Sequence, residues 1–399
     1  MSTGFEALNS DLPLSAADVP VLAGDSQAEP AAASGVSKRH RRVLHLINGE
    51  HYAGAERVQD LLAARLPEWG YLPGFACVKP GLFPQTRHCR RAPLYDVAMQ
   101  SRFDLRSINK LCQIVDDEGY ELLHSHTPRT AIVGRLLAAR RNLPWVYHVH
   151  SPAARDSARS WLNRLNAIIE RLSLHGVARL ITVSESLASY MRQQGYSAHQ
   201  VTVVTNGVPM PVVVPSRTPP IDTWTLGTIA LFRPRKGIEV LLDALAILRR
   251  RRLKVRLRAI GSFEYESYRR ELTERVRRLE LEPWVDWVGF QSDINAQLQQ
   301  LDLFVLPSLF GEGMPMVVLE AMAMGVPVIG TDVEGVPEAV RDGLDGRIAC
   351  AGDASDLAQA VASVVCGPCG WATLRQNALE RQAQHFSDVA MARGVAAVY

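Results

Sequence analysis

Two glutamates eight positions apart, Glu312 and Glu320, could do chemistry together. Glu320 is the only charged residue in the helical run 316–324, which is apolar on all sides and should therefore be buried. A buried carboxylate is costly unless something pairs with it. The pattern leaves two partners open, a ligand rich in hydroxyl groups or the backbone amides of a neighbouring loop.

Glu312 lies in a glycine-flanked loop, 310–315, between a predicted strand at 303–306 and a helix predicted to start at Pro315. Backbone amides at a helix N-terminus attract anions, and the helix dipole adds to that attraction. We therefore expect an exposed loop carboxylate, a run of loop amides and a buried carboxylate about 12 Å further along the helix, at ~1.5 Å per residue. That length suits a nucleotide sugar.

The elements that must position these glutamates alternate between strands and helices. The first series of strands is predicted at 42–48, 122–126, 145–150, 180–184 and 201–204, with helices at 56–66, 131–140, 161–174 and 185–194. The second has strands at 226–231, 255–260, 285–288, 303–306 and 327–330, with helices at 238–250, 268–279, 294–301, 315–324 and 336–340. This alternation predicts parallel sheets covered on both faces, with ligands beyond the carboxyl ends of the strands.

The length of 399 residues favours two domains. Segment 1–40 is rich in Ala, Ser, Asp and Pro and is predicted to be a disordered tail, while the proline-rich segment 209–222 is predicted to be a linker. We expect Rossmann-like domains at 41–208 and 223–380, facing a central cleft. Residues 381–399 should form a C-terminal helix that packs back toward the first domain.

Composition narrows the class of protein. The chain is 47% hydrophobic and carries a net charge of +3, which argues against a dedicated nucleic-acid binder. No apolar run approaches the roughly 20 residues that span a bilayer, and no signal peptide is visible. We expect a cytoplasmic protein, with peripheral association at the inner face of the membrane left open.

Several further motifs occur in a fixed order around the glutamate pair. They are Tyr52-Ala-Gly54-Ala-Glu56, His148-Val-His150, Val204-Thr-Asn206-Gly-Val208, Lys236-Gly237, and Gly335-Val-Pro-Glu338. Together with Glu312-x7-Glu320 they resemble the retaining GT-B glycosyltransferases of the family 4 type, over roughly residues 42–390. The resemblance implies an α/β GT-B fold of two tandem doubly wound domains and transfer of a sugar from a nucleoside-diphosphate donor, UDP- or GDP-linked.

The resemblance also implies roles by position. Glu312 would lie at the donor sugar, with Gly313, Met314 and Met316 supplying amides to its hydroxyls, and Glu320 would bind the ribose. Lys236 would neutralise the pyrophosphate and His150 would contact the sugar or the reacting centre. Additional lining residues would be Gly54 and Asn206 at the acceptor and phosphate loop, and Gly261 near the phosphates.

The phosphate-binding arginine departs from the family pattern. Its usual position aligns with Leu231, so Arg233 is expected to take the role, with Arg235 as the alternative. Positive charge there would stabilise the leaving pyrophosphate without a metal.

Three other features of the sequence have simpler interpretations beside a functional one. His124 and His126, with His148 or His150, could form a metal site, but no carboxylate that would orient them is evident, so no metal is expected. Cys366-Gly-Pro-Cys369 lacks the strand-to-helix context of a redox motif. Arg155, Arg159, Arg164 and Arg171 could face an anionic membrane, or form a solvated basic helix face.

The sequence therefore predicts a hexosyltransferase that acts on a glycan or lipid-linked acceptor in polysaccharide or cell-envelope biosynthesis. Two alternatives stay open: a nucleotide-sugar epimerase of the same fold, and a non-catalytic nucleotide or glycan binder. A Rossmann dehydrogenase is disfavoured because Gly-x-Gly-x-x-Gly does not follow the first strand.

Overall fold

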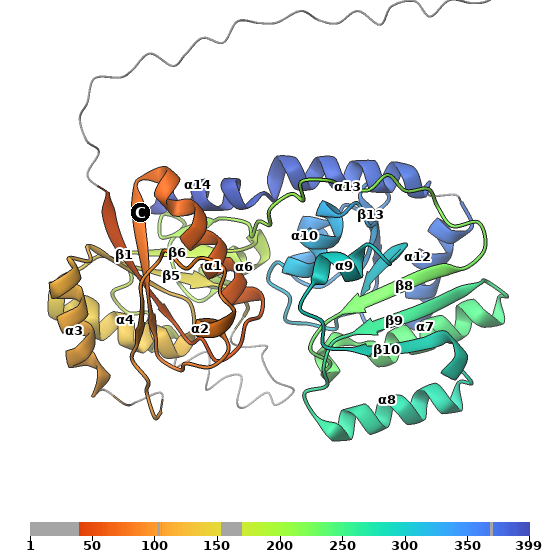
Figure 1. The fold of residues 1–399 in the computed structure, drawn as a ribbon, viewed down its shortest axis with the longest axis horizontal. Helices are drawn as coiled ribbons and strands as arrows, with labels where there is room; N and C mark the ends of the chain where they lie inside the picture. Colours follow the sequence, from red (N-terminus) through yellow and green to blue (C-terminus); the bar gives the residue numbers. More distant parts are fainter. Residues whose placement is uncertain (1–39, 102–103, 105, 153–169, 368–369) are drawn as a thin grey trace, which may run out of the picture. The chain divides into compact units, whose positions relative to one another are not determined.

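The computed structural model describes residues 40–399 except 102, 103, 105, 153–169 and 368–369. The described strands form two sheets, one in each half of this region (Figure 1). Every strand pair in both sheets is parallel. Parallel neighbours need crossover connections, which helices supply here, so the α/β prediction is confirmed.

The first sheet has the strand order β3-β2-β1-β4-β5-β6-β7. Its strands are β1 (Arg41–Ile47), β2 (Tyr71–Cys77), β3 (Leu94–Asp96), β4 (Leu122–Ser125), β5 (Trp145–Val149), β6 (Arg179–Thr182) and β7 (Val201–Val203). Its helices include α1 (Gly54–Arg65), α2 (Phe83–Thr86), α3 (Ser107–Glu118), α4 (Pro128–Arg141) and α6 (Glu185–Gln193). The strand order reverses between β1 and β4, and in open parallel sheets ligands bind beyond the carboxyl ends of the strands at such a reversal.

The second sheet has the order β10-β9-β8-β11-β12-β13 and reverses beside β8. Its strands are β8 (Trp224–Ile229), β9 (Val255–Ile260), β10 (Val285–Gly289), β11 (Leu303–Leu306), β12 (Val328–Thr331) and β13 (Gly346–Ala349). Its helices include α7 (Ile238–Arg250), α8 (Glu266–Arg278), α9 (Ile294–Leu298), α10 (Met316–Ala323), α11 (Val336–Ala339) and α12 (Ala354–Val365). Glu312 follows β11, which borders this reversal, and Glu320 lies on α10, the next helix.

Strand β2 was missed by the sequence pattern, as were β3, α3 and β13. Pro73 and Gly74 in the middle of β2 are typical turn residues, which hides the strand. In the structure β2 pairs with β1 along its whole length but with β3 only from Phe75 onward. Pro73 therefore lies outside the part of β2 that needs bonds on both edges.

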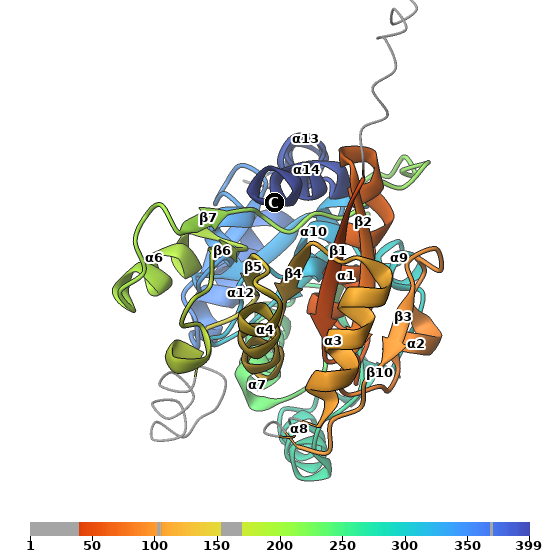
Figure 2. The ribbon, with the colours of Figure 1, turned by 90° about the vertical axis from the view of Figure 1, so that its left-hand side faces the viewer.

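The C-terminal segment is two helices rather than the single one expected at 381–399. Helix α13 (Trp371–His385) ends before Phe386, and the Ser387 hydroxyl caps α14 (Asp388–Val398) by accepting from the amide of Ala390 at 3.2 Å. Helix α13 packs on α10, and α14 packs on α1, where Arg65 pairs with Asp388 at 2.7 Å (Figures 1 and 2). None of the described helices is both long and apolar enough to cross a membrane.

Five histidines lie at the carboxyl ends of β1, β4 and β5: His45, His124, His126, His148 and His150. All but His150 are fully or nearly fully buried. Burial lowers the pKa of each imidazole, to about 3 for His45 and about 4 for His150, so all five are neutral at pH 7.

The buried histidines predict acid instability. In the unfolded chain their pKa is near 6.5, so below that pH the unfolded state binds more protons than the folded state. The contribution of these histidines to the free energy of unfolding should be constant well above pH 6.5. It should fall by up to ~1.4 kcal/mol per histidine per pH unit between pH 6.5 and 4. Denaturant unfolding at pH 7.5, 6.5 and 5.5 measures this loss.

One buried carboxyl group, that of Glu170, opposes this loss of stability at low pH. Burial raises the pKa of Glu170 to about 7, so its proton uptake between pH 7 and 4.5 favours the folded state. His148→Gln should reduce the pH slope by about one proton, whereas His199→Gln, at an exposed position, should leave it unchanged. Equal stability at pH 7.5 and 5.5 would contradict the prediction.

Candidate active site

Glu312 is buried, with 5% of its surface exposed, so the expectation of an exposed loop carboxylate was wrong. The Ser308 hydroxyl donates to its Oε1 at 2.6 Å, and the Lys236 ammonium forms an ion pair with the same oxygen. Arg235 Nη1 lies 4.0 Å from that oxygen. The loop folds inward because these cations and the hydroxyl replace the water that a carboxylate would otherwise need.

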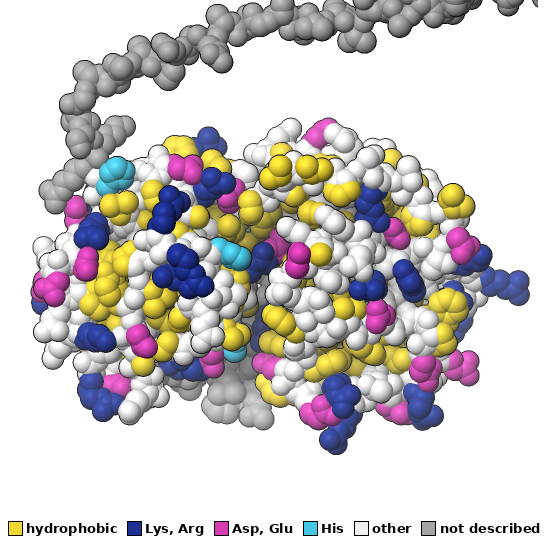
Figure 3. Space-filling model, in the orientation of Figure 1, with side chains coloured by type: hydrophobic (Ala, Val, Ile, Leu, Met, Phe, Trp, Pro, Cys, Tyr) yellow, Lys and Arg dark blue, Asp and Glu magenta, His cyan; other side chains and the backbone are white. Residues whose placement is uncertain are grey.

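The charge state of Glu312 follows from these neighbours. Burial by itself raises the pKa of the carboxyl, but the charges of Lys236 and Arg235 outweigh burial and hold the pKa below its usual value. Lys236 precedes α7 and Glu312 follows β11, so the pair bridges the loops after the adjacent strands β8 and β11. Basic and acidic side chains and histidines reach the surface in the furrow between the two sheet-bearing halves (Figure 3).

The two candidate arginines have different surroundings. Arg235 donates to the carbonyl of Gly311 at 2.9 Å and to that of Phe310 at 3.4 Å, so it ties down the Glu312 loop. Arg233 lies 3.8 Å from the carboxylate of Glu264, a long contact across a partly exposed site. Of the two arginines, Arg233 therefore makes the weaker contacts within the protein.

Glu334 organises the loop amides, and the sequence pattern missed it. Its Oε2 accepts from the amides of Gly311 at 2.9 Å and Glu312 at 3.1 Å. The carbonyl of Met314 accepts from the side-chain amide of Asn206 at 2.8 Å, and Asn206 is buried. Asn206 thus links the segment after β7 to the start of α10.

Two glycines allow the Glu312 loop to lie between other backbones. A Cβ on Gly313 would be 2.1 Å from the carbonyl oxygen of His150, and one on Gly335 would be 1.6 Å from that of Gly313. The amide of Gly335 also donates to the Glu312 carbonyl at 3.0 Å. The structure thus brings His150, which follows a strand of the first sheet, next to Gly313, which follows a strand of the second. Both residues can therefore contribute to one site.

Glu320 on α10 is buried and forms an ion pair with Arg57 of α1. Burial raises the pKa of Glu320, and the charge of Arg57 opposes that rise. The sequence had suggested a hydroxyl-rich ligand or the backbone amides of a loop as the partner of Glu320, and not Arg57. The only available signal was its position directly after Tyr52-Ala-Gly54-Ala-Glu56.

The remaining predicted lining residues lie around this core. Gly54 starts α1 beside Met316, with room for a methyl group, since its added Cβ would be 3.7 Å from Met316 Cγ. Gly261 follows β9, where an added Cβ would be 1.8 Å from the carbonyl of Ala230. Met314 and Met316 are buried.

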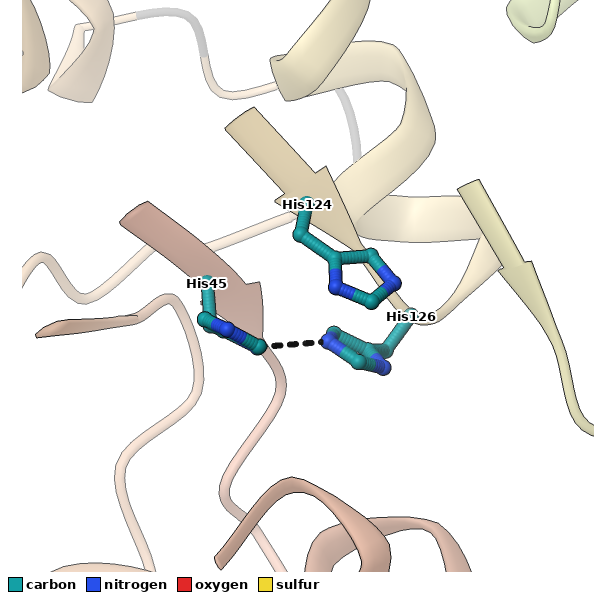
Figure 4. A group of neighbouring side chains, drawn as sticks. All are labelled: His45, His124 and His126. Atoms are coloured by element: carbon teal, nitrogen blue, oxygen red, sulfur yellow. Dashed lines mark hydrogen bonds between the residues drawn. The ribbon is translucent and has the colours of Figure 1, made fainter. Parts of the chain in front are cut away.

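The histidines on the β1–β4–β5 side contact one another. His45 Nδ1 lies 3.0 Å from His126 Nε2, and His126 Nδ1 lies 3.1 Å from His150 Nε2 (Figure 4 shows the first pair). In two sets, His45, His124 and His126, and His126, His148 and His150, one ring nitrogen of each lies within 4.8 Å of the others. Both sets consist of histidines alone.

Other features have structural roles or lie outside the described residues. The Glu338 carboxylate accepts from the amides of Glu185 at 2.6 Å and Ser186 at 2.8 Å, so it caps α6. Cys366 is an exposed free thiol, whereas Cys369 is outside the described residues. Most of the predicted basic helix 161–174, including Arg164, is also outside them, as are Arg155 and Arg159.

The site contains cationic and anionic side chains within one region. Lys236 and Arg233 can neutralise a diphosphate, while Glu312 and Glu320 can accept hydrogen bonds from sugar hydroxyls. His150 offers a neutral imidazole beside them. Such a set can bind a nucleoside-diphosphate sugar and stabilise charge on the departing phosphate.

Both halves of the chain match known families. Residues 52–210 match the family described as Glycosyltransferase Family 4, and residues 223–366 match the one described as Glycosyl transferases group 1. The two matches are separate: the first covers the first sheet from β2 onward, and the second covers the whole second sheet.

Curated relatives have related descriptions. The putative colanic acid biosynthesis glycosyltransferase WcaL of Escherichia coli is 29% identical over 220 residues, 52% of each chain. A D-inositol 3-phosphate glycosyltransferase of Catenulispora acidiphila is 29% identical over 302 residues, 70% of each chain. The chain spans about half the length, or less, of the first curated relatives that it matches.

Solved structures share the whole fold. HepE of Anabaena in complex with UDP-glucose has a TM-score of 0.79 at 23% identity, over 90% of this chain and 99% of that one. Sucrose-phosphate synthase of Thermosynechococcus elongatus has a TM-score of 0.75 at 23% identity, over 90% and 98%. The chain belongs to the glycosyltransferases of group 1 and family 4 and has their GT-B fold.

Proposed function

We propose that the protein is a retaining glycosyltransferase that transfers a hexose-type sugar from a UDP- or GDP-linked donor to a glycan or lipid-linked acceptor in polysaccharide biosynthesis. The observation that carries the proposal is the buried cluster of Lys236, Glu312 and Ser308 after β8 and β11. Names of relatives support it, including a UDP-Gal:alpha-D-GlcNAc-diphosphoundecaprenol alpha-1,3-galactosyltransferase of Escherichia coli, 24% identical over 262 residues.

Binding of the donor would exchange partners at two ion pairs. The diphosphate would take Lys236, with Arg233, and leave Glu312 to the sugar hydroxyls. The ribose hydroxyls would approach Glu320 and compete with or join Arg57. Each exchange replaces a contact within the protein by a contact with the donor, so the buried charges remain paired throughout.

The proposed reaction is a front-face displacement at the anomeric carbon. The acceptor hydroxyl attacks from the face that the nucleoside diphosphate leaves, and the departing phosphate oxygen takes the hydroxyl proton. Lys236 and Arg233 stabilise the charge that develops on that phosphate, and no metal is needed for the step as proposed. His150 lies next to Gly313, where it can orient a sugar hydroxyl.

Two alternatives make different products. A nucleotide-sugar epimerase of the same fold would convert the donor without an acceptor, which an NMR time course on the donor alone detects. A non-catalytic binder would shift the thermal unfolding temperature with nucleotide sugars but release no nucleoside diphosphate. A thermal-shift panel of UDP- and GDP-sugars identifies the donor to use in both assays.

The first prediction of this proposal concerns the buried ion pair. Glu312→Gln and Lys236→Met keep the size of each side chain but remove its charge. Either should lower turnover of the donor by ~100-fold or more, because the transition state loses charge stabilisation. Release of nucleoside diphosphate measures the effect.

Lys254→Met is the matched control for Lys236→Met. It removes a lysine from the exposed ion pair with Asp222 in the same half of the chain and should keep full turnover. Circular dichroism establishes that the variants are folded. Normal donor turnover by folded Glu312→Gln and Lys236→Met would refute the assigned roles.

A second prediction separates the two arginines. Arg233→Ala should weaken donor binding by at least about tenfold with little change in thermal stability, because its contact within the protein is long. Arg235→Ala should chiefly lower the unfolding temperature, because two loop carbonyls lose their donor. Calorimetric titration with the nucleoside diphosphate and thermal unfolding measure the two effects, and a reversed pattern would assign the phosphate to Arg235.

A further inference from the structure

A continuous path of hydrogen bonds runs from His150 into the core of the first half of the chain. His150 Nε2 lies 3.1 Å from His126 Nδ1, and His126 Nε2 lies 3.0 Å from His45 Nδ1. His45 Nε2 lies 3.4 Å from the hydroxyl of Tyr399, which lies 2.5 Å from His124 Nδ1. Four contacts therefore join residues from β1, the β4 and β5 ends and the end of α14.

The protonation states of the imidazoles limit which atom can donate in each hydrogen bond along the path. A neutral imidazole has one N–H and one bare nitrogen, and a hydroxyl donates once and can accept. Burial keeps these histidines neutral. If the Tyr399 hydroxyl donates to one of its two imidazole partners and accepts from the other, every bond along the path runs in the same sense, which gives two patterns with opposite tautomers on His150. A hydroxyl that accepted from both imidazoles would leave its own proton without an acceptor among these contacts, at a cost of ~1–3 kcal/mol.

The inner end of the path distinguishes the two patterns. Nε2 of His124 is buried and has no hydrogen-bond partner among the described residues. If all bonds ran inward from His150, that nitrogen would carry a proton with no acceptor. Orphaned buried N–H groups are rare and an unpaired donor costs ~1–3 kcal/mol. The outward pattern, which starts with His124 Nδ1 donating to Tyr399, leaves only a bare lone pair there.

We propose that Tyr399, His45 and His126 are positioning residues that hold His150 as the tautomer with its proton on Nδ1, the nitrogen not engaged by His126. His150 then presents an N–H, rather than a lone pair, at the ring nitrogen that His126 does not engage. The functional part of this inference rests on the proposed glycosyltransferase activity, where that N–H would donate to a donor hydroxyl or phosphate oxygen.

A metal site is the competing use of the same imidazoles. Three features of the cluster favour the hydrogen-bonded path. The nearest nitrogens of His45 and His126 already face one another (Figure 4), the rings of His124 and His126 lie with centroids 4.1 Å apart and planes inclined by 32°, and no carboxylate belongs to either set of three. A nitrogen engaged in a hydrogen bond with its neighbour has no lone pair left for an ion unless that bond breaks, and a buried dication among neutral ligands lacks compensating charge.

Tyr399→Phe breaks the path without removing a ring. Tyr71→Phe is its matched control, because the Tyr71 ring packs edge-on against Tyr399 with centroids 5.0 Å apart and takes no part in the path. The full chain is labelled with 15N-histidine, and His150→Gln identifies the His150 signals. We expect a protonated Nδ1 and a bare Nε2 for His150 in the wild type and in Tyr71→Phe. In Tyr399→Phe, a water in place of the lost hydroxyl can either donate to His45 Nε2 or accept from it, so the sense of the path is no longer fixed and we expect a mixture of tautomers.

Kinetics supply the second measurement. Tyr399→Phe should lower kcat by about tenfold while the donor KM changes less than about twofold, since the tautomer matters to orientation more than to overall affinity. Should Tyr399→Phe prove unfolded by circular dichroism, His45→Ala interrupts the same path one bond nearer to His150. Water in the vacated volume can donate to or accept from His126 Nε2, so the same tautomer mixture is expected.

Three results would overturn the inference. They are a wild-type His150 protonated at Nε2, identical His150 signals in the wild type and the folded path variant, or stoichiometric binding of added Zn²⁺ by the wild type that is lost in His45→Ala. The NMR readout needs no turnover. Failure of the glycosyltransferase proposal with the expected tautomer would thus be distinguishable from failure of the path.

Discussion

The buried ion pair between Lys236 and Glu312 is the interaction on which the rest of the site depends. Removing two charges from water costs several kcal/mol per ion unless further polar groups surround them. Ser308 supplies a hydroxyl to Glu312, and Arg235 supplies a second cation while holding the loop carbonyls. The same groups that make burial tolerable are therefore those that a negatively charged, hydroxyl-rich donor would engage.

Backbone contacts keep this charged cluster in place. Glu334 anchors the loop from one side by accepting two of its amides, and the glycines at 313 and 335 allow close approach on the others. The contact of Gly313 with the His150 carbonyl joins the loop of the second sheet to a strand end of the first. Both sheets reverse their strand order beside these residues, so the site lies where the topology of open parallel sheets favours ligand binding.

The two sides of the site differ in electrostatic character. The side after β8 and β11 holds fully charged groups, whereas the side after β1, β4 and β5 holds imidazoles that burial keeps neutral. Neutral imidazoles can exchange the sense of their hydrogen bonds at little cost, so their arrangement depends on the groups at the ends of the chain of bonds. Tyr399 joins His45 to His124, the inner end of this chain of bonds, because α14 packs against α1 and carries Tyr399 to the histidines.

Local pattern was sufficient for most of the architecture. The spacing of apolar residues identified β1, β4, β5, β8, β9 and α10, and with them the parallel sheets. This worked because the periodicity of a helix or a strand depends on residues that are close together in the sequence. It failed at β2, where Pro73 and Gly74 imitate a turn, and at the break before Ser387. The glutamate pair, Lys236 and His150 were recognisable from residue type and order.

What the sequence could not determine is which groups these residues touch. Lys236 and Glu312 are 76 positions apart, and His124 and Tyr399 are 275 apart, so their pairing depends on how loops from separate strands meet. Arg57, Glu334 and Tyr399 carry no local signal, because a charged or aromatic residue on a helix or loop is ordinary until its neighbours are known. The sequence by itself determined the elements and the chemical types at their ends. Only the tertiary structure decided that Glu312 is buried, that Arg57 pairs with Glu320 and that His150 is bonded to the core, because burial and partnership are properties of the packed chain.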